Sequence, residues 1–212
     1  MTHTTNTLHR PKPPPQNAYR VAVARAVEAL QRQSPEQIAW LGATDSANGW
    51  EIPVLGQRLS VRLPSGDVLT PRGETVRPNW QVLVLHYLGV RGRPAPEPPQ
   101  ITFADLAGGR GYAGVYRKRT VERLCATAGR TRESICAAAA SVGGRRTAAD
   151  PLAFRFDVFP RLSVGLVWHA ADEEFPAEAT WLLPPNIDQV LPIEDMVVLC
   201  ESCVSRLEGK PF

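Results

Sequence analysis

The sequence predicts an α+β fold in which a mostly antiparallel sheet, including a β-meander, is packed by about five helices. The first observation is the segment 161–185, the most apolar part of the chain. Its large apolar side chains recur at every second position, at Leu162, Val164, Leu166 and Trp168. The residues between them are mostly small or apolar as well. We therefore expect a strand that is covered on both faces in the middle of the sheet, with 180–183 as a partner strand.

The second observation is a change of period after residue 48. Short alternating stretches follow at 50–54, 59–63 and 68–69, separated by turn residues, which predicts a β-meander with one solvated face. A further strand is predicted at 152–159. The third observation is apolar spacing typical of helices. It occurs at 19–33, at 79–90 with Asn79 as a possible cap, at 115–128, at 132–142 and at 192–207, and a short helix restarts at Ser34.

Composition limits the class of protein. With 212 residues and 43% apolar content, residues 18–212 can form a single domain, whereas the Thr-rich and Pro-rich residues 1–17 are expected to be disordered. The net charge of +3 does not indicate nucleic-acid binding. The chain has no apolar run long enough for a membrane span, and no secretory signal. We therefore expect a cytoplasmic protein without a membrane partner.

An acidic loop interrupts the apolar segment. His169 ends the predicted strand, and Asp172, Glu173 and Glu174 follow it closely. Adjacent carboxylates repel one another, so this loop is expected either to be solvated or to meet a cation or basic groups.

A glycine-rich loop carries the spacing Gly109-x-Gly111-x-x-Gly114, which resembles a dinucleotide-binding motif. The motif does not directly follow a clear strand, which argues against a nucleotide. Its glycines are expected instead to let the loop pass close to the sheet. The loop is also basic and aromatic, with Arg110, Tyr112 and Tyr116, and these residue types suit an anionic ligand or a partner protein.

The cysteines and the buried histidine are expected to be structural. Cys200 and Cys203 lie in the second half of the last predicted helix, on or beside its apolar stripe, where cysteine packs as a small apolar residue. Metal binding and redox chemistry are the alternatives. His86 has no second metal ligand one helical turn away. We therefore assign no metal, and the sequence identifies no cofactor.

Four segments in this order resemble an uncharacterised prokaryotic family, domain-of-unknown-function family 3786: NWQVLVLHYLG (79–89), ITFADL (101–106), GLVWHAADEEFP (165–176) and IDQVLPIEDMVVL (187–199). The resemblance covers about 19–207. It implies a free-standing accessory domain, associated with metallocofactor or one-carbon metabolism. Some members of the family are joined to a four-cysteine iron–sulfur domain, but the N-terminal segment here has no cysteine. The family supplies no catalytic residues to transfer.

The first hypothesis is an accessory or ligand-binding protein that binds a small ligand or a protein partner where the two loops face each other. Its candidate site comprises Arg110, Tyr112, Tyr116, Trp168, His169, Asp172, Glu173 and Glu174. The second hypothesis is a small enzyme that uses the carboxylates with His169 as acid and base. The third is weak nucleic-acid binding through the basic residues at 117–119 and 145–146, which the balanced charge disfavours.

Overall fold

The structure is a computed structural model that describes residues 16–95 and 99–212. The predicted disordered tail falls mostly outside the described residues. Its last two residues, Gln16 and Asn17, belong instead to the first helix.

The N-terminal half forms one antiparallel sheet and three helices. The elements are α1 (Gln16–Leu30), α2 (Pro35–Trp40), β1 (Thr44–Ser46), β2 (Gly49–Val54), β3 (Gln57–Arg62), β4 (Val68–Leu69) and α3 (Pro78–Leu88). The strands follow one another in the order β1-β2-β3-β4, so the predicted meander is confirmed. Helix α3 begins one residue before the predicted cap at Asn79. Pro78 occupies the first helical turn, because its fixed φ suits that position.

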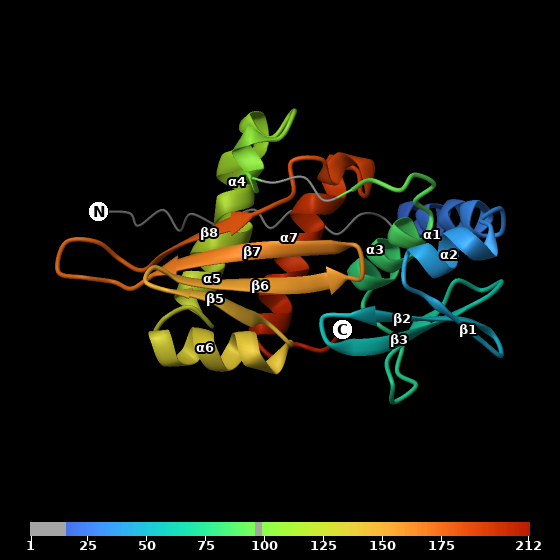
Figure 1. The fold of residues 1–212 in the computed structure, drawn as a ribbon, viewed down its shortest axis with the longest axis horizontal. Helices are drawn as coiled ribbons and strands as arrows, with labels where there is room; N and C mark the ends of the chain where they lie inside the picture. The colour runs from blue at the N-terminus through green and yellow to red at the C-terminus, as the bar shows by residue number, and fades with distance from the viewer. Residues whose placement is uncertain (1–15, 96–98) are drawn as a thin grey trace, which may run out of the picture.

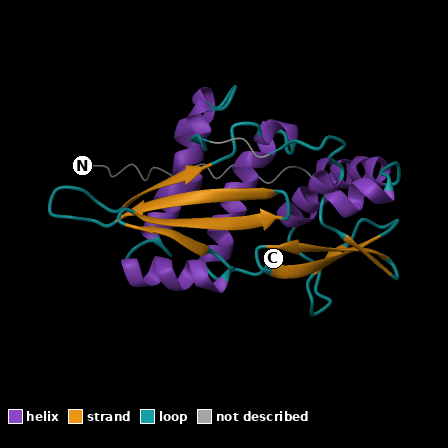
Figure 2. Cartoon of the chain, viewed as in Figure 1, coloured by secondary structure: helices purple, strands orange, loops and turns teal. Residues whose placement is uncertain are grey.

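The C-terminal half forms a second antiparallel sheet and the remaining helices. The elements are η1 (Phe103–Asp105), η2 (Arg110–Tyr112), α4 (Ala113–Arg117), η3 (Lys118–Glu122, a π-helical segment), α5 (Arg123–Ala126), α6 (Arg132–Ser141), β5 (Arg145–Ala149), β6 (Leu152–Phe159), β7 (Leu162–His169), β8 (Glu178–Leu182), η4 (Ile187–Gln189) and α7 (Ile193–Leu207). The strand order is β5-β6-β7-β8. The α+β class is therefore confirmed, with the strands divided between two sheets (Figure 2).

Strand β7 lies inside the second sheet, between β6 and β8, as its apolar pattern predicts. The expectation that both of its faces are covered is wrong. The run α4–η3–α5 and helix α7 cross one face of this sheet, and the other face carries no helix in the described part of the chain (Figure 1). Ser163 and Val167 on that face are only half-buried. Small side chains produce the same sequence pattern on a covered face and on an open one.

One hydrophobic cluster extends through both halves of the molecule. Leu55 donates its backbone N–H to Val158 across 3.3 Å, which links the β2–β3 turn to β6. Tyr87 of α3 stacks on Phe159 of β6 with ring centroids 4.3 Å apart, and its hydroxyl donates to the carbonyl of Leu41 at 2.8 Å. These contacts join the first sheet to β6 and fix α3 against β6 and the end of α2. Among the described residues no helix has the length and apolar character needed to cross a membrane.

Candidate functional site

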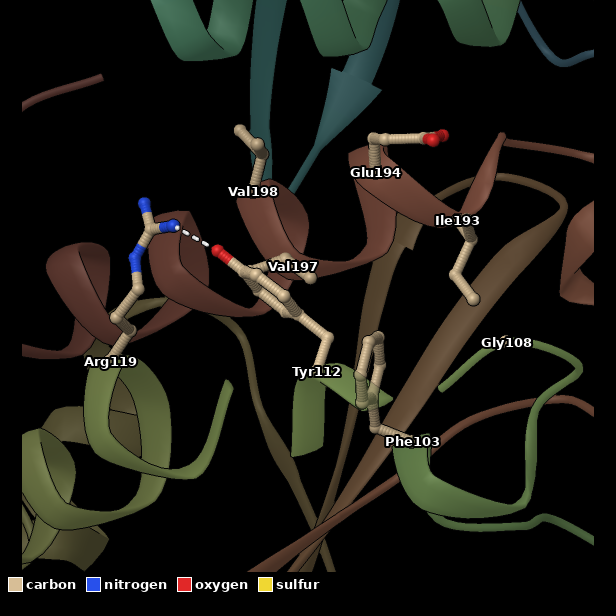
Figure 3. A pocket seen from close by; sticks show the side chains of 8 residues that line it. All are labelled: Phe103, Gly108, Tyr112, Arg119, Ile193, Glu194, Val197 and Val198. Atoms are coloured by element: carbon tan, nitrogen blue, oxygen red, sulfur yellow. Dashed lines mark hydrogen bonds between the residues drawn. The ribbon is translucent and has the colours of Figure 1, made fainter. Parts of the chain in front are cut away.

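A hollow of about 370 Å³ lies between the first half of α7 and the segment 103–119, which runs from η1 into η3. We call it the α7 groove. Its lining is Phe103, Gly108, Tyr112, Arg119, Ile193, Glu194, Val197 and Val198 (Figure 3). Most of these residues are apolar, and the polar groups are few. A concave apolar lining with a few placed polar groups is the usual character of a small-molecule site.

The floor of the α7 groove is positioned by a capping box at η1. The Asp105 carboxylate accepts hydrogen bonds from the backbone N–H of Thr102 at 3.1 Å and from its hydroxyl at 2.6 Å. The turn presents Phe103, whose buried ring stacks on Tyr116 with centroids 4.1 Å apart and planes 8° apart. Aromatic stacking of this kind stabilises the position of both rings.

The glycine-rich loop is explained by close packing within this wall of the groove. A Cβ added to Gly109 would lie 1.9 Å from the carbonyl oxygen of Phe103, so only glycine fits there. The approach is to the backbone of η1, which corrects the expectation of an approach to the sheet. The context of a dinucleotide motif is also lacking, because η1 and η2 precede α4 where that motif needs a strand.

Arg119 supplies the polar edge of the groove. It lies in the π-helical segment η3, and such segments occur frequently at functional sites. Its guanidinium donates to the Tyr112 hydroxyl oxygen at 3.3 Å (Figure 3) and forms a short ion pair with Glu201 of α7. Burial alone would lower the pKa of Arg119, but Glu201 and Tyr112 outweigh burial and raise it. The group therefore stays cationic, and the Tyr112 O–H remains a donor for a ligand.

Glu194 lies at the opposite end of the groove from Arg119 (Figure 3). Its neighbour in the first turn of α7, Asp195, is buried and contacts α3. The Oδ2 atom of Asp195 lies 2.6 Å from Nδ1 of His86, whose side chain is 30% exposed. This pair was not predicted. His86 was expected to be a structural residue, and no local pattern links it to Asp195, because the two residues are 109 positions apart.

The acidic loop lies elsewhere. Figure 1 shows the β7–β8 loop extending beyond the end of the second sheet, away from η2 and α4. His169, Asp172, Glu173 and Glu174 are all exposed there. Asp172 Oδ1 accepts the backbone N–H groups of Glu174 at 2.9 Å and of Phe175 at 2.7 Å, and these bonds lower the pKa of Asp172. The Asp172 carboxylate thus stabilises the turn of its own loop, and His169 is exposed beside it.

The predicted composite site is therefore not assembled, and only Tyr112 of its members lines the α7 groove. Arg110 is exposed on η2. Tyr116 and Trp168 are buried in the core, where the Trp168 Nε1–H donates to the carbonyl of Gly129 at 2.8 Å. A different ion pair joins the basic segment around α4 to the strand that follows the acidic loop. Arg117 of α4 donates to both carboxylate oxygens of Glu178 at the start of β8, at 2.8 and 2.6 Å.

Comparison with known proteins identifies the family of the chain. The family model "Domain of unknown function (DUF3786)" matches residues 34–206, which includes both sheets and most of α7. The chain belongs to this family. No curated protein and no solved structure matches the chain.

In this DUF3786 domain the cysteines of α7 are core residues. Cys200 and Cys203 are buried, and burial raises the pKa of Cys200 to about 12 and that of Cys203 well above its ordinary value. Thiols with raised pKa values are poor nucleophiles and poor metal ligands. Within the described ranges, no group of three or more His, Cys, Asp or Glu residues is placed to hold a metal ion.

Proposed function

We propose that this DUF3786 protein is a ligand-binding accessory protein whose α7 groove holds a small, mainly apolar molecule with a hydrogen-bonding group. The observation that carries the proposal is the composition of the groove. Phe103, Ile193, Val197 and Val198 form an apolar floor, and polar groups stand only at its ends. The cytoplasmic, prokaryotic setting and the link to metallocofactor or one-carbon metabolism belong to the same proposal and rest on the family resemblance.

The two ends of the groove would orient the ligand. Arg119 is fixed by Glu201 and in turn holds the Tyr112 oxygen, so the Tyr112 O–H is aimed by a rigid pair of side chains. Groups whose positions are set before binding lose less entropy when a ligand arrives. Tyr112 is 41% exposed, so a ligand has access to its hydroxyl. Glu194 at the other end is suited to accept a hydrogen bond or a positive charge.

A neutral fluorescent probe, phenyl-naphthylamine, tests the proposal because its emission rises in an apolar site. The native protein is expected to enhance this emission. Val198→Trp, which fills the groove, is expected to abolish it, whereas Val21→Trp on the exposed face of α1 is the matched control and retains it. Equal enhancement by both variants, with unchanged circular dichroism, would contradict the assignment.

The His86–Asp195 pair supports a second candidate function, acid–base catalysis. An acceptor carboxylate fixes the imidazole tautomer and leaves Nε2 as the base, a role that His169 on its open loop does not match. The test is turnover of a panel of nitrophenyl esters and phosphates. Activity that is lost in His86→Gln and retained in His169→Gln would support this function, and absence of turnover in the native protein would remove it.

The structure lends no support to nucleic-acid binding. Arg117, Arg119 and Arg145 each pair with a carboxylate, namely Glu178, Glu201 and Asp157. Paired arginines offer little charge for phosphate neutralisation.

A further inference from the structure

A second hollow of about 350 Å³ lies where α2, the loop after α3 and the β6–β7 turn meet. We call it the arginine pocket. Its basic side chains are Arg93, Arg155 and Arg161, and its aromatic residue is Trp40. The guanidinium carbons of Arg93 and Arg161 lie 5.8 and 5.1 Å from the centroid of the Trp40 ring. Segments far apart in the sequence therefore bring several positive charges to one hollow.

Neutral acceptors hold these arginines in place. Arg93 donates to the side-chain oxygen of Gln37 at 3.0 Å and to the backbone carbonyl of Glu36 at 3.3 Å. Arg161 donates to the backbone carbonyl of Trp40 at 2.7 Å. Within residues 16–95 and 99–212 neither guanidinium forms an ion pair with a carboxylate. Their positions are thus fixed without a direct ion pair to a described carboxylate, although the Glu36 carboxylate lies close enough to attract Arg93.

The third arginine, Arg155, shares its carboxylate partner with a fourth arginine. Asp157 accepts from Arg155 at 3.3 Å and from Arg145 at 2.8 Å, so one carboxylate faces two cations. With Arg93 and Arg161 added, positive charge exceeds negative charge around the pocket. Converging like charges destabilise a free protein, and an anion relieves that repulsion.

The arginine pocket adjoins the open face of the second sheet. A groove of about 490 Å³ runs over that face and shares Arg155, Ser163 and Pro184 with the pocket. Its floor is made of small or apolar residues on β6, β7 and β8: Ala153, Gly165, Val167 and Leu182. The floor is therefore mostly apolar, with the Gln100 side-chain oxygen against Gly165, and one end of it is basic.

We propose that the arginine pocket and the adjoining sheet face bind a small anion with a flat apolar body and a phosphate or carboxylate head group. The head group is held by Arg93 and Arg161 beside Trp40, because guanidinium groups match the planar or tetrahedral oxygens of such anions. The apolar body lies over Ala153 and Val167. This site is separate from the α7 groove and does not depend on the function proposed for it.

Isothermal titration with phenyl phosphate, benzoate and inorganic phosphate tests the proposal and distinguishes the two head groups. At least one aromatic anion is expected to bind, and its dissociation constant should rise about tenfold or more in Arg161→Gln and in Arg93→Gln. Arg110→Gln, an exposed arginine on η2, is the matched control and should not change it. Ala153→Leu, which narrows the groove, should weaken the aromatic anion and leave inorganic phosphate unchanged.

Three results would overturn the proposal. The first is a native protein that binds none of the three anions. The second is affinity unchanged in both arginine variants while thermal unfolding shows that they remain folded. The third is loss of binding in Val198→Trp, which would place the anion in the α7 groove.

Discussion

His86 and Asp195 are joined by a hydrogen bond of 2.6 Å between Nδ1 and Oδ2, which ties α3 to the first turn of α7. Asp195 is buried, and the His86 side chain is largely so. A hydrogen bond between such groups is stronger than one at the surface, because little water competes for either partner. The pair also lies one residue from Glu194, so it helps to fix the end of α7 that lines the α7 groove.

The His86–Asp195 pair is expected to be energetically coupled. In a double-mutant cycle with His86→Ala and Asp195→Ala, followed by urea unfolding, the coupling should be about 1–3 kcal/mol, as expected for a hydrogen bond to a charged group. Each single change removes one partner and leaves the other, at least partly buried, without its hydrogen bond, so the double variant should lose less than the two losses together. Strictly additive effects would show that the contact contributes nothing.

Glu208 is expected to make stability depend on acid pH. Burial alone would raise its pKa, but hydrogen bonds from Arg123 and Lys210 prevail and lower it from 4.5 to about 2. A carboxyl group whose pKa is lowered by folding stabilises the protein above its unfolded pKa and loses that effect as the pH falls towards its folded pKa. Glu208→Gln should therefore cost about 1–3 kcal/mol near neutral pH.

Urea unfolding at several pH values checks this prediction. The difference between native protein and Glu208→Gln should shrink from pH 4.5 downwards and vanish near pH 2. Glu173→Gln, an exposed carboxylate of the acidic loop, is the control and should show no comparable loss. A difference that is independent of pH would mean that Glu208 acts through packing.

The Arg117–Glu178 pair is expected to stabilise the domain modestly. Its geometry is bidentate, but both side chains are about half exposed, and such pairs contribute about 0.2–1 kcal/mol. Arg117→Gln should lower the unfolding free energy by that amount, and high salt should reduce the difference. Arg110→Gln should have no effect. The reverse ranking would revive the predicted contact between Arg110 and the acidic loop.

The cysteines of α7 are expected to resist thiol reagents. Burial raises the pKa of Cys200 to about 12, so almost no thiolate forms near neutral pH. With Ellman's reagent, Cys200 and Cys203 should react only after unfolding in guanidinium, when all four cysteines become available. Mass spectrometry of the labelled peptides identifies the residues that react. Rapid labelling of either residue in folded protein would show that α7 opens.

Much of the fold could be predicted from the sequence, because periodic side-chain patterns depend on local geometry. The period of two along β7 and the helical stripe of α7 both led to the correct element. Strand β5 was missed, because its sequence RRTAA is exposed at every position and carries no alternation. The open face of β7 was missed because Ser163 and Gly165 suit either a helix above them or solvent.

The site was largely beyond sequence reasoning. Tyr112 was predicted because it is an aromatic residue in a glycine-rich loop. Arg119 was considered only as part of a basic run, and Ile193 and Val198 only as parts of a helix. They form one groove because α7 packs against a segment about 80 residues earlier in the chain, as the Arg119–Glu201 contact shows. No local pattern specifies such a contact.

Ligand binding in the α7 groove can be mapped residue by residue with an amide chemical-shift titration using phenyl-naphthylamine. The shifted resonances should concentrate in residues 103–119 and 193–201, and Val198→Trp should remove these shifts while Val21→Trp leaves them in place. Shifts concentrated on β1–β4, or no shifts at saturating probe, would contradict binding in the groove.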